Sequence, residues 1–181
     1  MIARLALIAA LSVGQPAAAQ SMNVPGIVRD VMGQICAPYA EDGNIIQAIA
    51  AARALGYRPE GHWADHPIAP NDPPHDISLT RRHHGTVTLA KNYNRGLCAV
   101  GIAEGGPSNM GPAAEPFLRA LGMEPVVDIR DEQPLDMFVW RGTGRQVVIA
   151  ASPRFTPGSE LVLSFDTNRR RRAAVAGEGR P

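Results

Sequence analysis

The sequence predicts an α+β domain in two layers, with an antiparallel sheet of about five strands covered on one face by three helices. Apolar residues recur at helical spacing in the first third of the chain, whereas from Thr86 onward short runs alternate between apolar and polar residues. Hairpin turns separate these runs, and one further helical segment lies between them. This order is typical of α+β domains rather than of folds with a parallel sheet.

The chain begins with a segment typical of a bacterial secretory signal peptide. Met1–Arg4 carries a positive charge, residues 5–13 form an apolar run too short to span a bilayer, and Ala17–Ala19 shows the small-residue pattern that signal peptidase recognises. We therefore predict that residues 1–19 are removed and that Gln20 begins the mature protein. No transmembrane segment is expected after cleavage, so the sequence predicts a periplasmic or secreted location.

The remaining residues divide into one domain and a short basic tail. Residues 20–166 suit a single α+β domain with one core. Basic and acidic side chains balance once residues 1–19 are removed, so nucleic-acid binding through overall charge is not expected. Residues 167–181 hold almost nothing to bury, which predicts a disordered tail able to contact an anionic envelope surface. Its basic run is Arg169, Arg170, Arg171 and Arg172.

Two helices are expected at the start of the domain. Asn23 can cap a first helix from about Val24 to Cys36, in which apolar residues recur at helical spacing. The pair Ala37-Pro38 is expected to break this helix. A second helix follows from about Ile45 to Leu55, and Gly56 stands where a left-handed residue closes a helix.

The strands are expected in two groups on either side of a third helix. Residues 60–85 contain four prolines and are predicted to form a long loop. Residues 86–102 alternate as a hairpin with one apolar face. A third helix is expected at about 108–121, and the last strands lie within 138–165.

Cys36 and Cys98 are the only cysteines of the chain. In an exported protein an isolated pair is most simply one disulfide, and two free thiols are the alternative. Cys98 shares the apolar face of the hairpin with Val100 and Ile102, so it points toward the core, where a helix that carries Cys36 can pack against it. The sequence therefore predicts a Cys36–Cys98 disulfide.

Two similar stretches, Ala54–Pro59 and Ala120–Pro125, each end a helix before a group of strands. The pattern Leu-Gly-x-x-Pro is also an ordinary helix stop. Two interpretations stay open: a shared helix stop, or an internal duplication with two αββ halves.

All five histidines of the chain fall in residues 62–84, together with several aspartates and arginines. A transition metal such as zinc needs three or four converging His, Cys or carboxylate ligands. The spacing here matches no specific metal motif, so a zinc site is an alternative and not the main expectation. The candidate ligands are His62, Asp65, His66, His75, His83 and His84.

Three features carry a resemblance: an early helix ending in a cysteine, an alanine-rich helix closed by Leu55-Gly56-Tyr57, and a strand with Leu97-Cys98-Ala99-Val100. With these features the chain resembles a loose group of small exported bacterial proteins of unknown function. The resemblance covers residues 30–103. Because the group has no established activity, the resemblance implies nothing about catalysis.

The sequence contains no recognisable catalytic set. It has no nucleophile elbow, phosphate-binding loop or closely spaced redox cysteine pair. It therefore favours a periplasmic or envelope-associated binding or accessory domain with no cofactor. The alternative is a metal-dependent hydrolase built on the histidine-rich loop 62–84.

Overall fold

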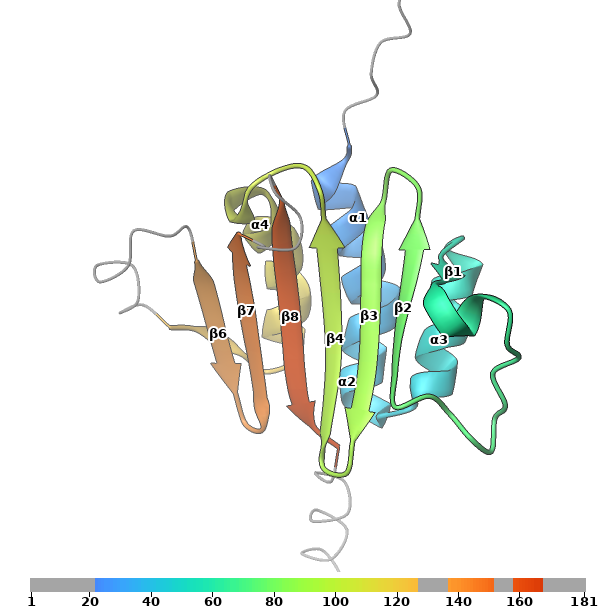
Figure 1. Cartoon of the computed structure of the whole chain (residues 1–181). Coiled ribbons are helices and arrows are strands. Elements are labelled where there is room, and N and C mark those ends of the chain that lie inside the picture. The colour runs from blue at the N-terminus through green and yellow to red at the C-terminus, as the bar shows by residue number, and fades with distance from the viewer. Residues whose placement is uncertain (1–21, 127–136, 152–157, 168–181) are drawn as a thin grey trace, which may run out of the picture.

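A computed structural model of the chain describes residues 22–126, 137–151 and 158–167. In this part of the chain, helices lie on one face of an antiparallel sheet, which confirms the predicted α+β class (Figure 1). The sheet has eight strands, so the prediction of about five is wrong. The predicted signal peptide and the run Arg169–Arg172 lie outside the described residues.

Three helical units form the layer behind the sheet (Figure 1). The first is continuous and consists of α1 (Val24–Val31), a π-helical turn η1 (Met32–Cys36) and α2 (Ala37–Asp42). The other two are α3 (Ile45–Ala54) and α4 (Pro107–Ala120).

The predicted helix break at Ala37-Pro38 is wrong, because the helix continues through it. Proline has no N–H and therefore interrupts the regular hydrogen bonds of a helix interior. The π turn directly before it uses a wider spacing, in which the Ala37 N–H donates to the Met32 carbonyl. The unit ends instead at Gly43, whose φ of 67° lies in the left-handed region.

The strands form two groups of four. The first group is β1 (Arg58–Pro59), β2 (Asp76–Arg81), β3 (Gly85–Asn92) and β4 (Arg95–Ile102). The second group is β5 (Glu124–Pro125), β6 (Phe138–Gly142), β7 (Arg145–Ala151) and β8 (Ser159–Asp166). A short 3-10 helix, η2 (Gly61–Ala64), follows β1.

The strands beyond the predicted ones are short or polar. β1 and β5 have two residues each, and each contains a proline, so neither can show an alternating pattern. β2 falls within the segment predicted as a long loop, and only Ile77 and Leu79 among its side chains are buried. These two aliphatic residues suffice to bring the segment into the sheet, because both face the core.

The strand order across the sheet is β1-β2-β3-β4-β8-β7-β6-β5, and all neighbours are antiparallel. In each half of the chain a helix leads into four strands, α3 into β1–β4 and α4 into β5–β8. The last strands of the two halves, β4 and β8, meet in the middle. This is the arrangement expected of two halves related by a pseudo-twofold axis normal to the sheet.

The pairing register agrees with this symmetry. The two similar helix ends define which residues of the two halves correspond to each other. When the pairing register of each half is followed from its helix end, Cys98 of β4 corresponds to Leu161 of β8, and Val100 corresponds to Leu163. Across the centre of the sheet, Cys98 pairs with Leu163 and Val100 with Leu161. Exchanging the two halves converts each of these two pairs into the other. The register therefore favours internal duplication over a merely shared helix stop.

Alternate residues of each strand face the helices and form the core. In β8 these are Leu161, Leu163 and Phe165, which are buried. The other face is covered by none of the helices in the described residues (Figure 1). The middle row of cross-strand neighbours on that face carries no charge, and its members are Ser78, Thr88, Ala99, Val162, Val148 and Val139.

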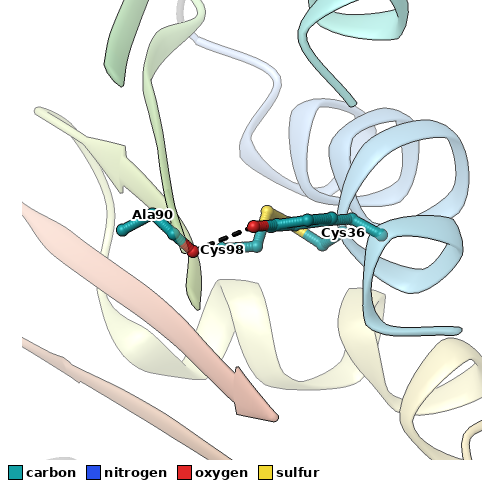
Figure 2. The surroundings of a disulfide bond; sticks show 4 residues. Cys36, Ala90 and Cys98 are labelled. Carbon is teal, nitrogen blue, oxygen red and sulfur yellow. Dashed lines mark hydrogen bonds between the residues drawn. A yellow bond between two sulfur atoms is a disulfide. The ribbon is translucent and has the colours of Figure 1, made fainter. Parts of the chain in front are cut away.

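The predicted disulfide is present. Cys36 and Cys98 are bonded, and their Cα atoms lie 5.5 Å apart. Cys36 is the last residue of the π turn and Cys98 lies in β4, so the bond joins the helical layer to the centre of the sheet (Figure 2). Both side chains are fully buried. Disulfides of this kind form and persist in oxidising compartments.

Tyr39 joins α2 to the sheet near the disulfide. Its hydroxyl donates a hydrogen bond of 2.9 Å to the carbonyl of Ala90 in β3. Its ring meets the Phe165 ring edge-on, with centroids 4.9 Å apart. The hydrogen bond satisfies the one polar group of an otherwise buried side chain.

Two buried tyrosines lead us to expect a loss of stability in alkaline solution. Burial raises the pKa of Tyr57 to about 12, and burial, followed by the charge of Asp42, raises the pKa of Tyr39 still further. Tyrosines of the unfolded chain ionise near pH 10. The neutral phenols therefore make their full contribution to the free energy of unfolding below about pH 10, and this contribution is lost as the pH rises toward the pKa values of the folded state. Urea denaturation should therefore show a free energy of unfolding that falls above about pH 10. The double variant Tyr39→Phe/Tyr57→Phe should show a smaller fall, and a parallel fall in both proteins would assign the effect to other groups.

Candidate functional site

The structure brings His62 and His66 into contact but gathers no third potential metal ligand around them. His62 and His66 stack, with ring centroids 3.9 Å apart, and the His66 Nδ1 atom lies 2.7 Å from the His62 carbonyl oxygen. His84, in the turn between β2 and β3, has its Nδ1 atom 3.1 Å from the Arg82 carbonyl oxygen. Within residues 22–126, 137–151 and 158–167, no group of three or more His, Cys, Asp or Glu side chains could hold a metal ion.

The condition for a zinc site, three converging ligands, is therefore not met by His62, Asp65, His66, His75, His83 and His84. β2 separates His75 from the last two candidates. Its six residues of extended chain place His75 and His83 at opposite ends of a strand, about 20 Å apart. The four prolines of residues 60–85 predicted one long loop, and a loop does not imply such a separation.

A polar pocket of about 480 Å³ lies at one end of the sheet, and we call it the strand-end pocket. It is formed by the turn between β3 and β4, the turn between β6 and β7, and the end of β8. These three segments are far apart in the sequence. The lining side chains able to form hydrogen bonds are Asn94, Arg95, Arg145, Gln146, Ser164 and Asp166.

Two backbone hydrogen bonds hold these segments together. The Thr167 N–H donates to the Asn94 carbonyl at 3.0 Å, and the Asp166 N–H donates to the Gly144 carbonyl at 2.8 Å. The end of β8 is thus bonded to both turns. Gly144 has a φ of 66°, a conformation that favours glycine. A Cβ atom at this position would also lie only 3.3 Å from the Asp166 Cβ atom, so glycine permits the close approach of turn and strand.

Arg145 bonds the pocket to the helical layer. Its Nη1 atom donates to the Leu121 carbonyl at 2.7 Å, and its Nη2 atom donates to the Ala40 carbonyl at 3.2 Å. Leu121 directly follows α4, and Ala40 lies in the last turn of α2. Carbonyls at helix C-termini lack partners within the helix and favour a nearby cation. We therefore assign Arg145 a structural role in positioning the wall of the pocket.

Four other lining residues lie on the sheet face that the helices leave open. Arg95 and Asp166 are direct cross-strand neighbours at the ends of β4 and β8, and Gln146 and Ser164 are neighbours on β7 and β8. The Ser164 Oγ atom donates to the Gln146 carbonyl at 3.3 Å. The pocket thus presents a guanidinium, a carboxylate and an amide to solvent at one place.

Tyr93 stands in the same turn as Asn94 and Arg95. Its side chain is 97 % exposed, and it is the only exposed large hydrophobic residue in the part of the chain that the structure describes. The Tyr93 N–H donates to the Asn92 Oδ1 atom at 2.8 Å. This bond holds the backbone of the turn while the aromatic ring stays in water.

A second pocket, of about 260 Å³, lies between η1, α2 and α3. Its lining includes Ile35, Tyr39, Ala48 and Ala51, and Asp42 is its one charged residue. It is smaller than the strand-end pocket and does not combine opposite charges. The strand-end pocket is therefore the better candidate for a functional site.

Sequence reasoning did not single out the residues of the strand-end pocket. Each lies where a strand begins or ends, and the strand ends meet only because β8 pairs with both β4 and β7. The available signal is local, namely an arginine directly after a turn residue in Asn94-Arg95 and Gly144-Arg145. That pattern indicates where two strands begin, but not that they lie near each other.

Comparisons of the chain with known protein families, with curated proteins and with solved structures give no match. The resemblance to a loose group of exported bacterial proteins therefore stays a prediction. Among the described residues, no helix combines the length and the apolar character needed to cross a membrane.

Proposed function

We propose that the protein is a periplasmic or envelope-associated binding domain whose ligand site is the strand-end pocket. The observation that carries this proposal is the convergence of Arg95, Gln146 and Asp166 from three separate segments into one depression of about 480 Å³. A few converging polar groups in a concave site are what small-molecule recognition requires.

Two features support the proposed location. Residues 1–19 have the pattern of a signal peptide, and the Cys36–Cys98 disulfide is a bond typical of exported proteins. The basic run Arg169–Arg172 follows Asp166 closely in the sequence. A contact between this run and anionic envelope lipids would hold the strand-end pocket near the envelope surface.

Recovery of the protein from a bacterial periplasm tests this proposal. The chain is produced with its own leader, and we expect an intact mass that begins at Gln20 and lacks the two hydrogens of the disulfide. Mass spectrometry under non-denaturing conditions should show a retained small molecule in the wild type and its loss in Arg95→Ala. The matched control is Arg53→Ala, which removes an exposed arginine near the end of α3. Retention of the leader, or equal ligand retention in both variants, would contradict the proposal.

A further inference from the structure

We infer that the strand-end pocket binds an uncharged, hydroxyl-rich ligand, an oligosaccharide, with one sugar ring stacked on Tyr93. This inference rests on the proposed binding function and adds the chemical class of the ligand. It depends on two observations that are independent of each other: the mixed polarity of the pocket, and the exposed aromatic ring of Tyr93 in a turn that forms part of the pocket.

The pocket presents donors and acceptors together. The guanidinium of Arg95 only donates, the carboxylate of Asp166 only accepts, and the side-chain amides of Asn94 and Gln146 do both. Arg95 and Asp166 are direct cross-strand neighbours, so the pocket presents a cationic and an anionic group at one place. An anion would meet the carboxylate, and a cation would meet the guanidinium. A hydroxyl group both donates and accepts, so it can pair with either kind of group.

The shapes of these groups also fit a sugar. A guanidinium, a carboxylate and an amide each present two polar atoms in one plane. Two hydroxyls on adjacent carbons of a sugar ring offer a matching pair of atoms. Asn94, Arg95, Gln146 and Asp166 supply four such planar groups to one pocket.

Tyr93 supplies the apolar part of the site. One face of a pyranose ring consists largely of C–H groups, which pack against the face of an aromatic ring. The Tyr93 ring is almost fully exposed, so packing of a sugar ring on it removes apolar surface from water. Tyr93 directly precedes Asn94, which lines the pocket. A chain of several sugars can therefore rest one ring on Tyr93 while the next ring occupies the pocket.

Isothermal titration calorimetry of the disulfide-bonded mature protein tests the inference. The probes are chitotetraose, cellotetraose, maltotetraose and mannotetraose, with sodium phosphate as the anion and glutamate as the zwitterion. We expect at least one tetrasaccharide to bind and neither small ion to do so. Tyr93→Ala should weaken the binding about tenfold or more, whereas Tyr93→Phe keeps the ring and should stay within about threefold of the wild type. Arg95→Ala should weaken the binding to a similar degree, and the control Arg53→Ala should leave it unchanged.

The other outcomes each have a definite meaning. Binding of phosphate or glutamate instead of sugars, with loss in Arg95→Ala, would overturn the sugar inference but leave the binding function standing. Sugar binding that survives both Tyr93→Ala and Arg95→Ala would overturn the assignment to this pocket. Binding of none of the probes would overturn the sugar inference, while the ligand retained in the periplasmic protein tests the binding function separately. Because both side chains are exposed, neither substitution removes packing, and equal melting temperatures should confirm that the variants are folded.

Discussion

The double variant Cys36→Ala/Cys98→Ala is expected to lose about 4 kcal/mol of its free energy of unfolding. The two cysteines are 62 positions apart. A cross-link across a loop of that length lowers the entropy of the unfolded chain, and at 25 °C this raises the free energy of the unfolded state by about 4 kcal/mol. Small domains are stable by only about 5–15 kcal/mol, so the loss is a large fraction of the total. Urea denaturation of the variant and of the oxidised wild type measures the difference.

Reduced wild-type protein is the control that separates the cross-link from the loss of two sulfur atoms. Reduction opens the bond without removing side-chain atoms, so the reduced wild type should show most of the same loss. The single variant Cys36→Ala leaves Cys98 as an odd thiol and should form disulfide-linked dimers when it unfolds. A double variant as stable as the oxidised wild type would contradict the role assigned to the bond.

Leu161→Ala is expected to lower the free energy of unfolding by about 2–5 kcal/mol, whereas Val162→Ala should lower it by about 1 kcal/mol. Leu161 lies in β8, faces the helices and is fully buried. Val162 is the next residue, is half-buried, and lies on the face that no helix covers. The two positions are well matched, because both pair with β4 on one side and β7 on the other.

Urea denaturation under identical conditions distinguishes these two variants. A large loss for Leu161→Ala and a small one for Val162→Ala would agree with a sheet packed on one face only. Equal losses would mean that both faces are packed alike, which contradicts the two-layer architecture.

The parts of the fold that were predicted correctly depend on local patterns. The alternation around Cys98 and Val100 predicted both the hairpin and the inward direction of Cys98, and this direction supported the disulfide. Helical spacing from Val24 onward predicted the first helix. Such patterns are set by which side of an element is buried, and neighbouring residues in the sequence already contain that information.

The parts that were missed depend on contacts between distant segments. β1 and β5 are too short to show the alternation of apolar and polar residues. β1 is a strand because it pairs with β2, and β5 is a strand because it pairs with β6. The helix continues through a π turn before Pro38 because it packs on the sheet through Tyr39, although proline disfavours the interior of a regular helix. Tertiary packing overrides local propensity at these places.

The candidate site could not be predicted for a related reason. The metal hypothesis was based on the clustering of histidines in residues 62–84 of the sequence, yet β2 separates His75 from His83 and His84 in space. The strand-end pocket, in contrast, joins Arg95 to Asp166 and Gln146 only through the register of β8 with its two neighbours. The symmetric strand order that brings β4 and β8 together was hinted at by the two Leu-Gly-x-x-Pro stretches, but those stretches do not determine the register.

The central claim is that the strand-end pocket is the ligand site of this protein. Amide correlation spectra of the ¹⁵N-labelled mature protein, recorded during titration with the tightest-binding of the six probes, test it most directly. We expect the largest shifts at the amides of Tyr93, Arg95, Gln146 and Asp166, and unchanged signals from η2 and from the turn between β2 and β3. Shifts centred on residues 62–84, with the strand-end pocket unaffected, would contradict the claim.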